Sequence, residues 1–220
     1  MRRVRRAAGV AAVTAALAVG GVGPAAADSA TIKDMRGDAF VGSAQCGKTA
    51  AERSFARQTD VTSATFTVGR KYVSLKVRFA NLRPGPSYVV LTDIVQRGRN
   101  GAASLRGAFS PAGSNALATS PFSGNYTCGD PSQPGIPAGV PPIATTVKYG
   151  KNGYFKAQMP FGCMEAFGVD PSAKVKGRTP TWKANVIVQA TVPNLAAGLT
   201  DCVSSTRPDK AKWSTYIKAG

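Results

Sequence analysis

The sequence predicts an all-β protein: an antiparallel β-sandwich, jelly-roll or immunoglobulin-like, with long disulfide-stapled loops. Three observations indicate this class. Several segments alternate apolar and polar residues, as strands with one buried face do. Clusters of glycine, proline and asparagine separate these segments. No long segment has the 3.6-residue periodicity of a helix, and about seven to nine strands in one chain favour a sandwich.

The first three strands are expected between residues 62 and 95. Thr62 to Val68 and Tyr72 to Ala80 both alternate, and the short link Gly69-Arg70-Lys71 is typical of a hairpin turn. Tyr88 to Val95 reads "YVVLTDIV" and is more continuously apolar, which predicts a central strand buried on both faces. The apolar side of the second strand consists of Val73, Leu75, Val77 and Phe79.

The next part of the chain is expected to hold a weaker strand, a long loop and a second hairpin. Ser104 to Phe109 is the weaker strand. Residues 110–142 are dense in Pro, Gly, Ser and Asn and are expected to form the long loop. Ile143 to Tyr149 and Tyr154 to Met159 flank Asn152-Gly153, a strong hairpin signal because both residues tolerate positive φ.

The C-terminal part is expected to add a loop over 160–180 and one long alternating strand from Trp182 to Val192. A short strand from Trp213 to Ile217 is expected to close the sheet edge. The single short helix predicted in the chain lies within Ala44 to Arg57.

Residues 1–27 have the three parts of a cleavable signal peptide. Met1 to Arg6 is basic, Ala7 to Val22 is small and apolar, and Ala25-Ala26-Ala27 fits the cleavage rule. The apolar run is shorter than the roughly 20 residues that a membrane-spanning helix needs. We therefore expect export to the extracellular space, with residues 28–220 as a single β-sandwich domain.

The cysteines favour disulfides over a metal site. The four cysteines are Cys46, Cys128, Cys163 and Cys202, and the chain contains no histidine. No Cys-x-x-Cys pair gives the spacing usual for zinc. In an exported chain two disulfides are the better interpretation, each contributing roughly 2–4 kcal/mol. Of the three pairings we favour Cys128–Cys163 with Cys46–Cys202.

The charge points to anionic partners. Without residues 1–27, which carry four arginines, 24 basic residues remain against 11 acidic ones, a formal charge of +13. Such a charge favours a cell-wall polymer, an acidic glycan or an anionic surface. Charge spread evenly for solubility is the alternative, and the basic residues form no tract that would specify nucleic acid.

The residue types argue against most hydrolytic chemistry. Without histidine the usual nucleophilic triads and dyads are excluded. Carboxylate catalysis would need two acids roughly 5–10 Å apart. The acids considered are Glu52, Glu165 and Asp93, and neither glutamate lies on a predicted strand. Asp93 is expected to face outward from its strand, because a buried carboxylate needs a partner.

Three tyrosines are candidates for contact with a ligand. Tyr126 lies in the long predicted loop, and Tyr149 and Tyr154 flank the Asn-Gly turn. Exposed aromatic rings suit stacking against a sugar. The alternative is that they are ordinary cross-strand tyrosines of a sheet.

The segment "KDMRGDA", residues 33–39, has three interpretations. Asp34, Asp38 and Asp60 supply three carboxylates for a hard cation such as Ca²⁺ if the segment folds back against the first clear strand. A turn is the simpler interpretation, because Gly37 accepts positive φ and aspartates bond to turn amides. The tripeptide Arg36-Gly37-Asp38 also matches an adhesion motif, a match that is common by chance.

The pattern "DMRGDA" followed by "DVTSATFTVGRKYVSLKVRFANL" resembles secreted actinobacterial proteins that open with Asp-x-x-Gly-Asp. These proteins are broadly similar to DOMON domains or family-9 carbohydrate-binding modules. The resemblance covers roughly residues 33–95. It implies a β-sandwich, a cation near Asp34, Asp38 and Asp60, and binding rather than catalysis.

The function expected from the sequence is that of a secreted, cationic, non-catalytic protein that binds an anionic or glycan surface at the cell envelope. One alternative is a hydrolase or a protein inhibitor acting through residues 110–142. A structural envelope protein without a ligand is the other.

Overall fold

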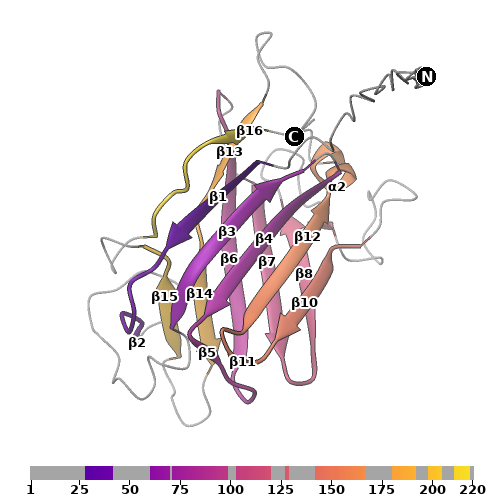
Figure 1. The fold of residues 1–220 in the computed structure, drawn as a ribbon. Helices are drawn as coiled ribbons and strands as arrows, with labels where there is room; N and C mark the ends of the chain where they lie inside the picture. The colour runs from indigo at the N-terminus through magenta and orange to yellow at the C-terminus, as the bar shows by residue number, and fades with distance from the viewer. Residues whose placement is uncertain are drawn as a thin grey trace, which may run out of the picture.

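The computed structural model describes residues 28–41, 60–69, 71–98, 103–119, 127–128, 142–166, 180–191, 198–204 and 211–218. The described strands form antiparallel sheets arranged as an all-β sandwich, with one sheet in front of the other (Figure 1). This arrangement confirms the predicted all-β class. No helix in the described ranges is long and apolar enough to cross a membrane.

The front sheet has five strands and faces the viewer in Figure 1. Its three central strands alternate buried and more exposed residues, so the apolar side of these strands faces the core. The strand order is β1 (Asp28–Lys33), β3 (Val61–Val68), β4 (Tyr72–Phe79), β12 (Tyr154–Pro160) and β10 (Ala144–Lys148).

The back sheet is longer and carries the C-terminal strands. Its main path is β2 (Phe40–Val41), β15 (Leu199–Cys202), β14 (Ile187–Thr191), β6 (Ser87–Gln96), β7 (Ala103–Ser110), β8 (Gly113–Thr119) and β9 (Thr127–Cys128). β13 (Thr181–Ala184) pairs with both β6 and β16 (Ile217–Lys218). A separate pair joins β5 (Asn81–Leu82) to β11 (Gly150–Lys151).

Both predicted hairpins are confirmed, and one turn differs in detail. β3 pairs with β4, and β10 pairs with β12. In the second hairpin Asn152 has a φ of 56° and Gly150 a φ of 100°, whereas Gly153 lies outside the positive-φ region. Gly153 is required for space instead, because a Cβ there would lie 2.5 Å from the Lys148 carbonyl oxygen.

An aromatic cluster joins the two sheets. Phe109 of β7 stacks on Phe155 of β12, with ring centroids 5.0 Å apart. On its other side Phe109 stacks on Tyr88 at 4.7 Å, and Phe79 meets Tyr88 edge-on. The Phe155 ring also lies over Gly107, where a Cβ would come within 2.3 Å of the ring. The absence of a side chain at Gly107 therefore leaves space in the back sheet, and the Phe155 ring of the front sheet fills it.

Five predictions about elements are wrong in part. Of the strand predicted from Trp213 to Ile217, only Ile217 lies in a strand, β16. Within the predicted loop 110–142, Gly113–Thr119 forms β8. Its buried side carries Ala116 and Ala118, whose small side chains give no clear apolar alternation in the sequence. Within the predicted loop 160–180, Phe161–Ala166 forms a short helix, α2. The predicted strand 182–192 is interrupted at residues 185–186. The strand predicted to be buried on both faces, β6, is only half-buried on its outer face.

Besides β8, the longest strands that were not predicted are β1 and β15. β1 is short and mostly polar, and it pairs along its whole length with β3. β15 reads "LTDC" and is buried throughout, without the alternation that marks a half-buried strand. Neither Cys163 nor Cys202 carries a free thiol. The side chains of Cys46 and Cys128, residues 1–27 and residues 44–57 lie outside the described ranges, so the predictions for them remain predictions.

Candidate functional site

The "KDMRGDA" segment forms a turn between β1 and β2. Arg36 and Gly37 lie at its tip, and Gly37 has a φ of 73°, as the turn interpretation predicted. The Gly37 N–H donates to Asp60 Oδ1 at 2.9 Å. The Asp34 N–H donates to the carbonyl of Thr62 at 3.1 Å. The segment therefore folds back against the start of β3, which was the condition set for a cation site.

The turn is also held to the far end of the chain. The Ser204 N–H donates to Asp34 Oδ1 at 2.6 Å, and the Met35 N–H donates to the Ser204 carbonyl at 3.2 Å. Just before Ser204, β15 carries Asp201, whose side chain is completely buried. The Val61 N–H donates to Asp201 Oδ2 at 2.9 Å. These bonds bring Asp201 to the turn.

Three carboxylates meet at this place and are called here the aspartate cluster: Asp34, Asp38 and Asp201. Each offers an oxygen, and these oxygens all lie within 4.8 Å of one another. Asp34 Oδ2, both oxygens of Asp38 and Asp201 Oδ1 are buried and have no hydrogen-bond partner. Of the predicted ligands, Asp34 and Asp38 belong to the cluster. Asp60 lies beside it, and its Oδ1 accepts the bond from Gly37.

Asp201 was missed by the sequence analysis. An acid inside a fully buried strand is a strong signal, because a carboxylate is rarely buried without a partner. The signal could not be used because "LTDC" was not recognised as a strand. Its pairing with β14 and the bond to Val61 join residues far apart in the sequence.

The cluster is electrostatically unfavourable in the absence of a positive charge. Burial is the main reason that the pKa of Asp34 is raised to about 8; the hydrogen bond from Ser204 lowers the pKa in part, and the charge of Asp38 adds to the increase. Burial, followed by the charge of Asp60, raises the pKa of Asp38 to about 6. Burial and the charge of Asp34 raise the pKa of Asp201 well above its usual value. All three carboxyl groups resist ionisation in this arrangement.

The adhesion interpretation of Arg36-Gly37-Asp38 is wrong for this fold. An adhesion ligand presents its carboxylate to a partner, whereas both carboxylate oxygens of Asp38 are buried. Asp38 faces the aspartate cluster instead.

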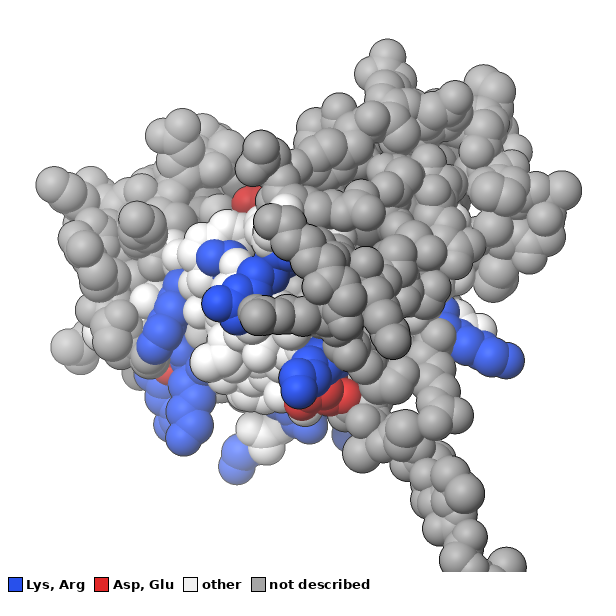
Figure 2. Space-filling model, turned by 90° about the horizontal axis from the view of Figure 1, so that it is seen from above, with Lys and Arg blue, Asp and Glu red and all other residues white. Residues whose placement is uncertain are grey.

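The outer side of the front sheet forms a second candidate site. Strand register places Lys33, Ser63, Arg78, Tyr154 and Lys148 in one row across the sheet. The neighbouring row contains Thr31, Thr65, Lys76, Lys156 and Thr146. We call these two rows the basic face. They carry five cationic residues and no acid. Figure 2 shows basic side chains projecting on the side that faces the viewer in Figure 1.

Like charges are crowded on the basic face. Lys76 and Lys156 stand directly opposite each other on β4 and β12. Desolvation, followed by the charges of Arg78, Lys156 and Lys148, lowers the pKa of Lys76. The Lys76 amine lies 4.2 Å from the centre of the Tyr154 ring. Directly opposed like charges destabilise a sheet. The pairing of Lys76 with Lys156 therefore lowers the stability of the fold, and a role other than stability would explain its presence.

The predicted tyrosine site is only partly assembled. Tyr154 lies on the basic face beneath Lys76. Tyr149 packs against the core and its hydroxyl oxygen is buried, so the expectation that it is exposed is wrong. Tyr126 lies outside the described residues. Of the three, the structure therefore places Tyr154 alone on the basic face.

No protein-family model matches the chain, and no curated protein or solved structure matches it. The resemblance to DOMON domains and family-9 carbohydrate-binding modules therefore stays an expectation from the sequence. Any functional conclusion rests on the two sites described above.

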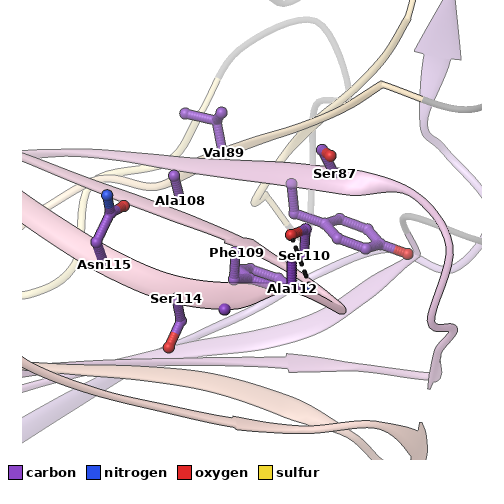
Figure 3. Close-up of a pocket in the computed structure, with 10 residues that line it drawn as sticks. Ser87, Val89, Ala108, Phe109, Ser110, Ala112, Ser114 and Asn115 are labelled. Carbon is purple, nitrogen blue, oxygen red and sulfur yellow. Dashed lines mark hydrogen bonds between the residues drawn. The ribbon is translucent and has the colours of Figure 1, made fainter.

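A pocket of about 420 Å³ lies beside the β7–β8 turn, which is closed by a bond from the Ala112 N–H to Ser110 Oγ (Figure 3). Its lining offers hydroxyl, amide and apolar groups without a carboxylate or an amine: Ser87, Tyr88, Val89, Ala108, Phe109, Ser110, Ala112, Gly113, Ser114 and Asn115. This pocket therefore lacks a carboxylic acid–base pair of the kind that glycosidases use.

The acids considered for catalysis do not form a site in the described ranges. Asp93 Oδ1 accepts a bond from Ser104 Oγ at 3.1 Å, and Oδ2 accepts one from Asn185 at 3.3 Å. These bonds tie β6 to β7 and to the interruption after β13, and Asp93 lies on the outer side as predicted. Glu52 and the side chain of Glu165 lie outside the described residues.

Proposed function

We propose that this is a secreted, non-catalytic binding protein that holds an extended anionic polymer of the cell envelope against its basic face. The observation that carries the proposal is the two-row arrangement of Lys33, Lys76, Arg78, Lys148 and Lys156 without an acid among them. The signal peptide and the disulfides expected from the sequence are part of this proposal.

The shape and chemistry of the basic face suit a linear polyanion. Five strands spaced about 4.8 Å apart make a surface roughly 19 Å wide. The neighbouring outward positions of the same strands carry serine, threonine and glutamine, which can hydrogen-bond to hydroxyl groups: Ser29, Thr67, Ser74 and Gln158. Arg78 offers a planar fork for a phosphate or carboxylate group. Tyr154 adds a ring in the middle of the charged row.

A binding assay with defined polymers tests the proposal. We expect the protein to bind a poly(glycerol phosphate) wall polymer or polygalacturonate at low salt, and not neutral dextran. Raising the salt concentration should weaken binding steeply, because counterions compete for the same charges. Failure to bind either polyanion at low salt would show that the basic face has no such ligand.

Two charge-matched double variants locate the binding surface. Replacing Lys76 and Lys156 with glutamine removes the centre of the basic face. At roughly 0.7 per contact with a flexible polyanion, we expect the slope of log affinity against log salt to fall by about 1.4. The control variant replaces Arg106 and Lys183, on the outer side of the back sheet, with glutamine. It removes the same amount of charge away from the basic face. Equal losses in both double variants would mean attraction by net charge alone.

The single variant Lys156→Thr should stabilise the protein while weakening polymer binding. It removes the repulsion opposite Lys76 and places a β-branched residue in a strand. We expect the free energy of unfolding to rise by about 0.2–1 kcal/mol at low salt, measured by denaturant unfolding. A loss of stability would mean that Lys156 is held by contacts that outweigh the repulsion.

A further inference from the structure

We propose that the aspartate cluster binds one hard divalent cation, best matched by Ca²⁺, through Asp34, Asp38 and Asp201. This inference does not depend on the proposed function, because the cluster lies at the end of β1 and uses none of the residues of the basic face.

The donor atoms indicate the class of ion. All three are carboxylate oxygens, which suit a hard cation, whereas structural zinc sites favour nitrogen and sulfur. Calcium binds oxygen at about 2.3–2.6 Å, so oxygens on opposite sides of one ion lie about 4.8 Å apart. The three oxygens lie within that distance of one another. Magnesium binds oxygen at about 2.1 Å in a near-ideal octahedron and usually keeps several waters with one or two carboxylates, so it fits a three-carboxylate site less well.

The state of Asp201 is an independent sign of a missing partner. Its side chain has no exposed surface, and Oδ1 has no hydrogen-bond partner. Two further acids of the cluster face this oxygen, and their own free oxygens are also buried. A buried, unpaired carboxylate oxygen is costly, and the cost is relieved by a cation or by a proton shared with Asp34.

The surroundings suit a partly hydrated ion. Asp34 Oδ1 and Asp201 Oδ2 are occupied by backbone N–H donors, which fix the two carboxylates and leave one oxygen of each for the ion. Three carboxylate oxygens fill only part of the coordination shell of calcium, so water or backbone carbonyls would supply the remaining ligands. Asp60, held by the Gly37 N–H, adds a fourth negative charge beside the site.

Calcium titration of the chelator-treated protein tests the site. We expect isothermal titration calorimetry to show one Ca²⁺ per chain. The unfolding temperature should rise as CaCl₂ is added, because the ion binds the folded state. MgCl₂ should act more weakly, and KCl at equal ionic strength should not reproduce the effect. Absence of any calcium effect at millimolar concentration would overturn the proposal and indicate a shared proton instead.

Asn substitutions make the test sharper, because two effects of opposite sign are expected. Asp201→Asn keeps an oxygen for the Val61 N–H and replaces a buried carboxyl group that is costly to ionise. It should therefore raise the unfolding temperature of the metal-free protein and abolish the calcium response. Asp93→Asn, outside the cluster, should keep the full response. A calcium response that survives in Asp201→Asn would overturn the assignment.

If Asp201→Asn does not fold, Asp38→Asn decides the question. Asp38 is half-buried and its carboxylate bonds to no other described group, so the substitution breaks no hydrogen bond. We expect calcium affinity to fall by at least tenfold with an unchanged circular dichroism spectrum. An unchanged affinity would exclude Asp38 as a ligand and contradict the three-carboxylate site.

Discussion

The calcium-free protein should lose stability as the pH rises from about 4 to 8. Asp34 and Asp38 have an ordinary pKa of 3.8, raised in the folded protein to about 8 and about 6. In this range the folded chain holds protons that the unfolded chain has released. Each such proton lowers the free energy of unfolding by about 1.4 kcal/mol per pH unit. The total should amount to several kcal/mol, with the Asp34 shift larger than the Asp38 shift.

Denaturant unfolding in a chelator at a series of pH values measures this loss. Saturating calcium should flatten the profile, because the bound ion favours the ionised carboxylates in the folded state. Asp34→Asn should remove a large part of the slope. A stability that rises from pH 4 to 8 without calcium would show that other groups outweigh the cluster.

Replacing Phe155 with alanine should lower the free energy of unfolding by about 3–5 kcal/mol. The side chain is completely buried, and its ring stacks on Phe109 at 5.0 Å. It is the ring of the front sheet that fills the gap left by Gly107. The cavity created would lie at the contact between the sheets, where neighbouring strands cannot easily close it. Denaturant unfolding measures the effect.

Gly107→Ala tests the other side of the same contact. Its Cβ would come within 2.3 Å of the Phe155 ring, so we expect a cost of about 1–3 kcal/mol or more. In the background Phe155→Leu, whose side chain is shorter, the cost of Gly107→Ala should become much smaller. Additive losses in the double variant would mean that the ring and the glycine do not interact.

Most of the front sheet was predictable because three of its five strands carry a local signal. Period-two alternation in β3, β4 and β12 puts a full apolar row against the core, and such a row is visible in the sequence. β8 and β1 lack it, since small or polar residues occupy their inward or edge positions. The position of each of these two strands depends on its pairing with a neighbouring strand, which a local sequence pattern does not reveal.

The aspartate cluster and the basic face were also predictable only where the signal is local. Asp34 and Asp38 were identified because a turn of a few residues brings them together. Asp201 was not, because its place depends on the pairing of β15 with β14. Likewise Lys76 and Arg78 face one way by alternation alone, whereas Lys156 and Lys148 join them through strand register. The sequence therefore identifies the residues of each site that lie close together in the chain. It does not show which distant strands bring the remaining residues to them.

The aspartate cluster combines the turn after β1 with β15, and the bond between Ser204 and Asp34 spans 170 residues. A chain that is synthesised only as far as β14 lacks Asp201 and has no such site. The ion would then add free energy to the finished domain and none to its fragments. In this proposal the ion stabilises the domain only after the turn that follows β1 and the strand β15 have come together.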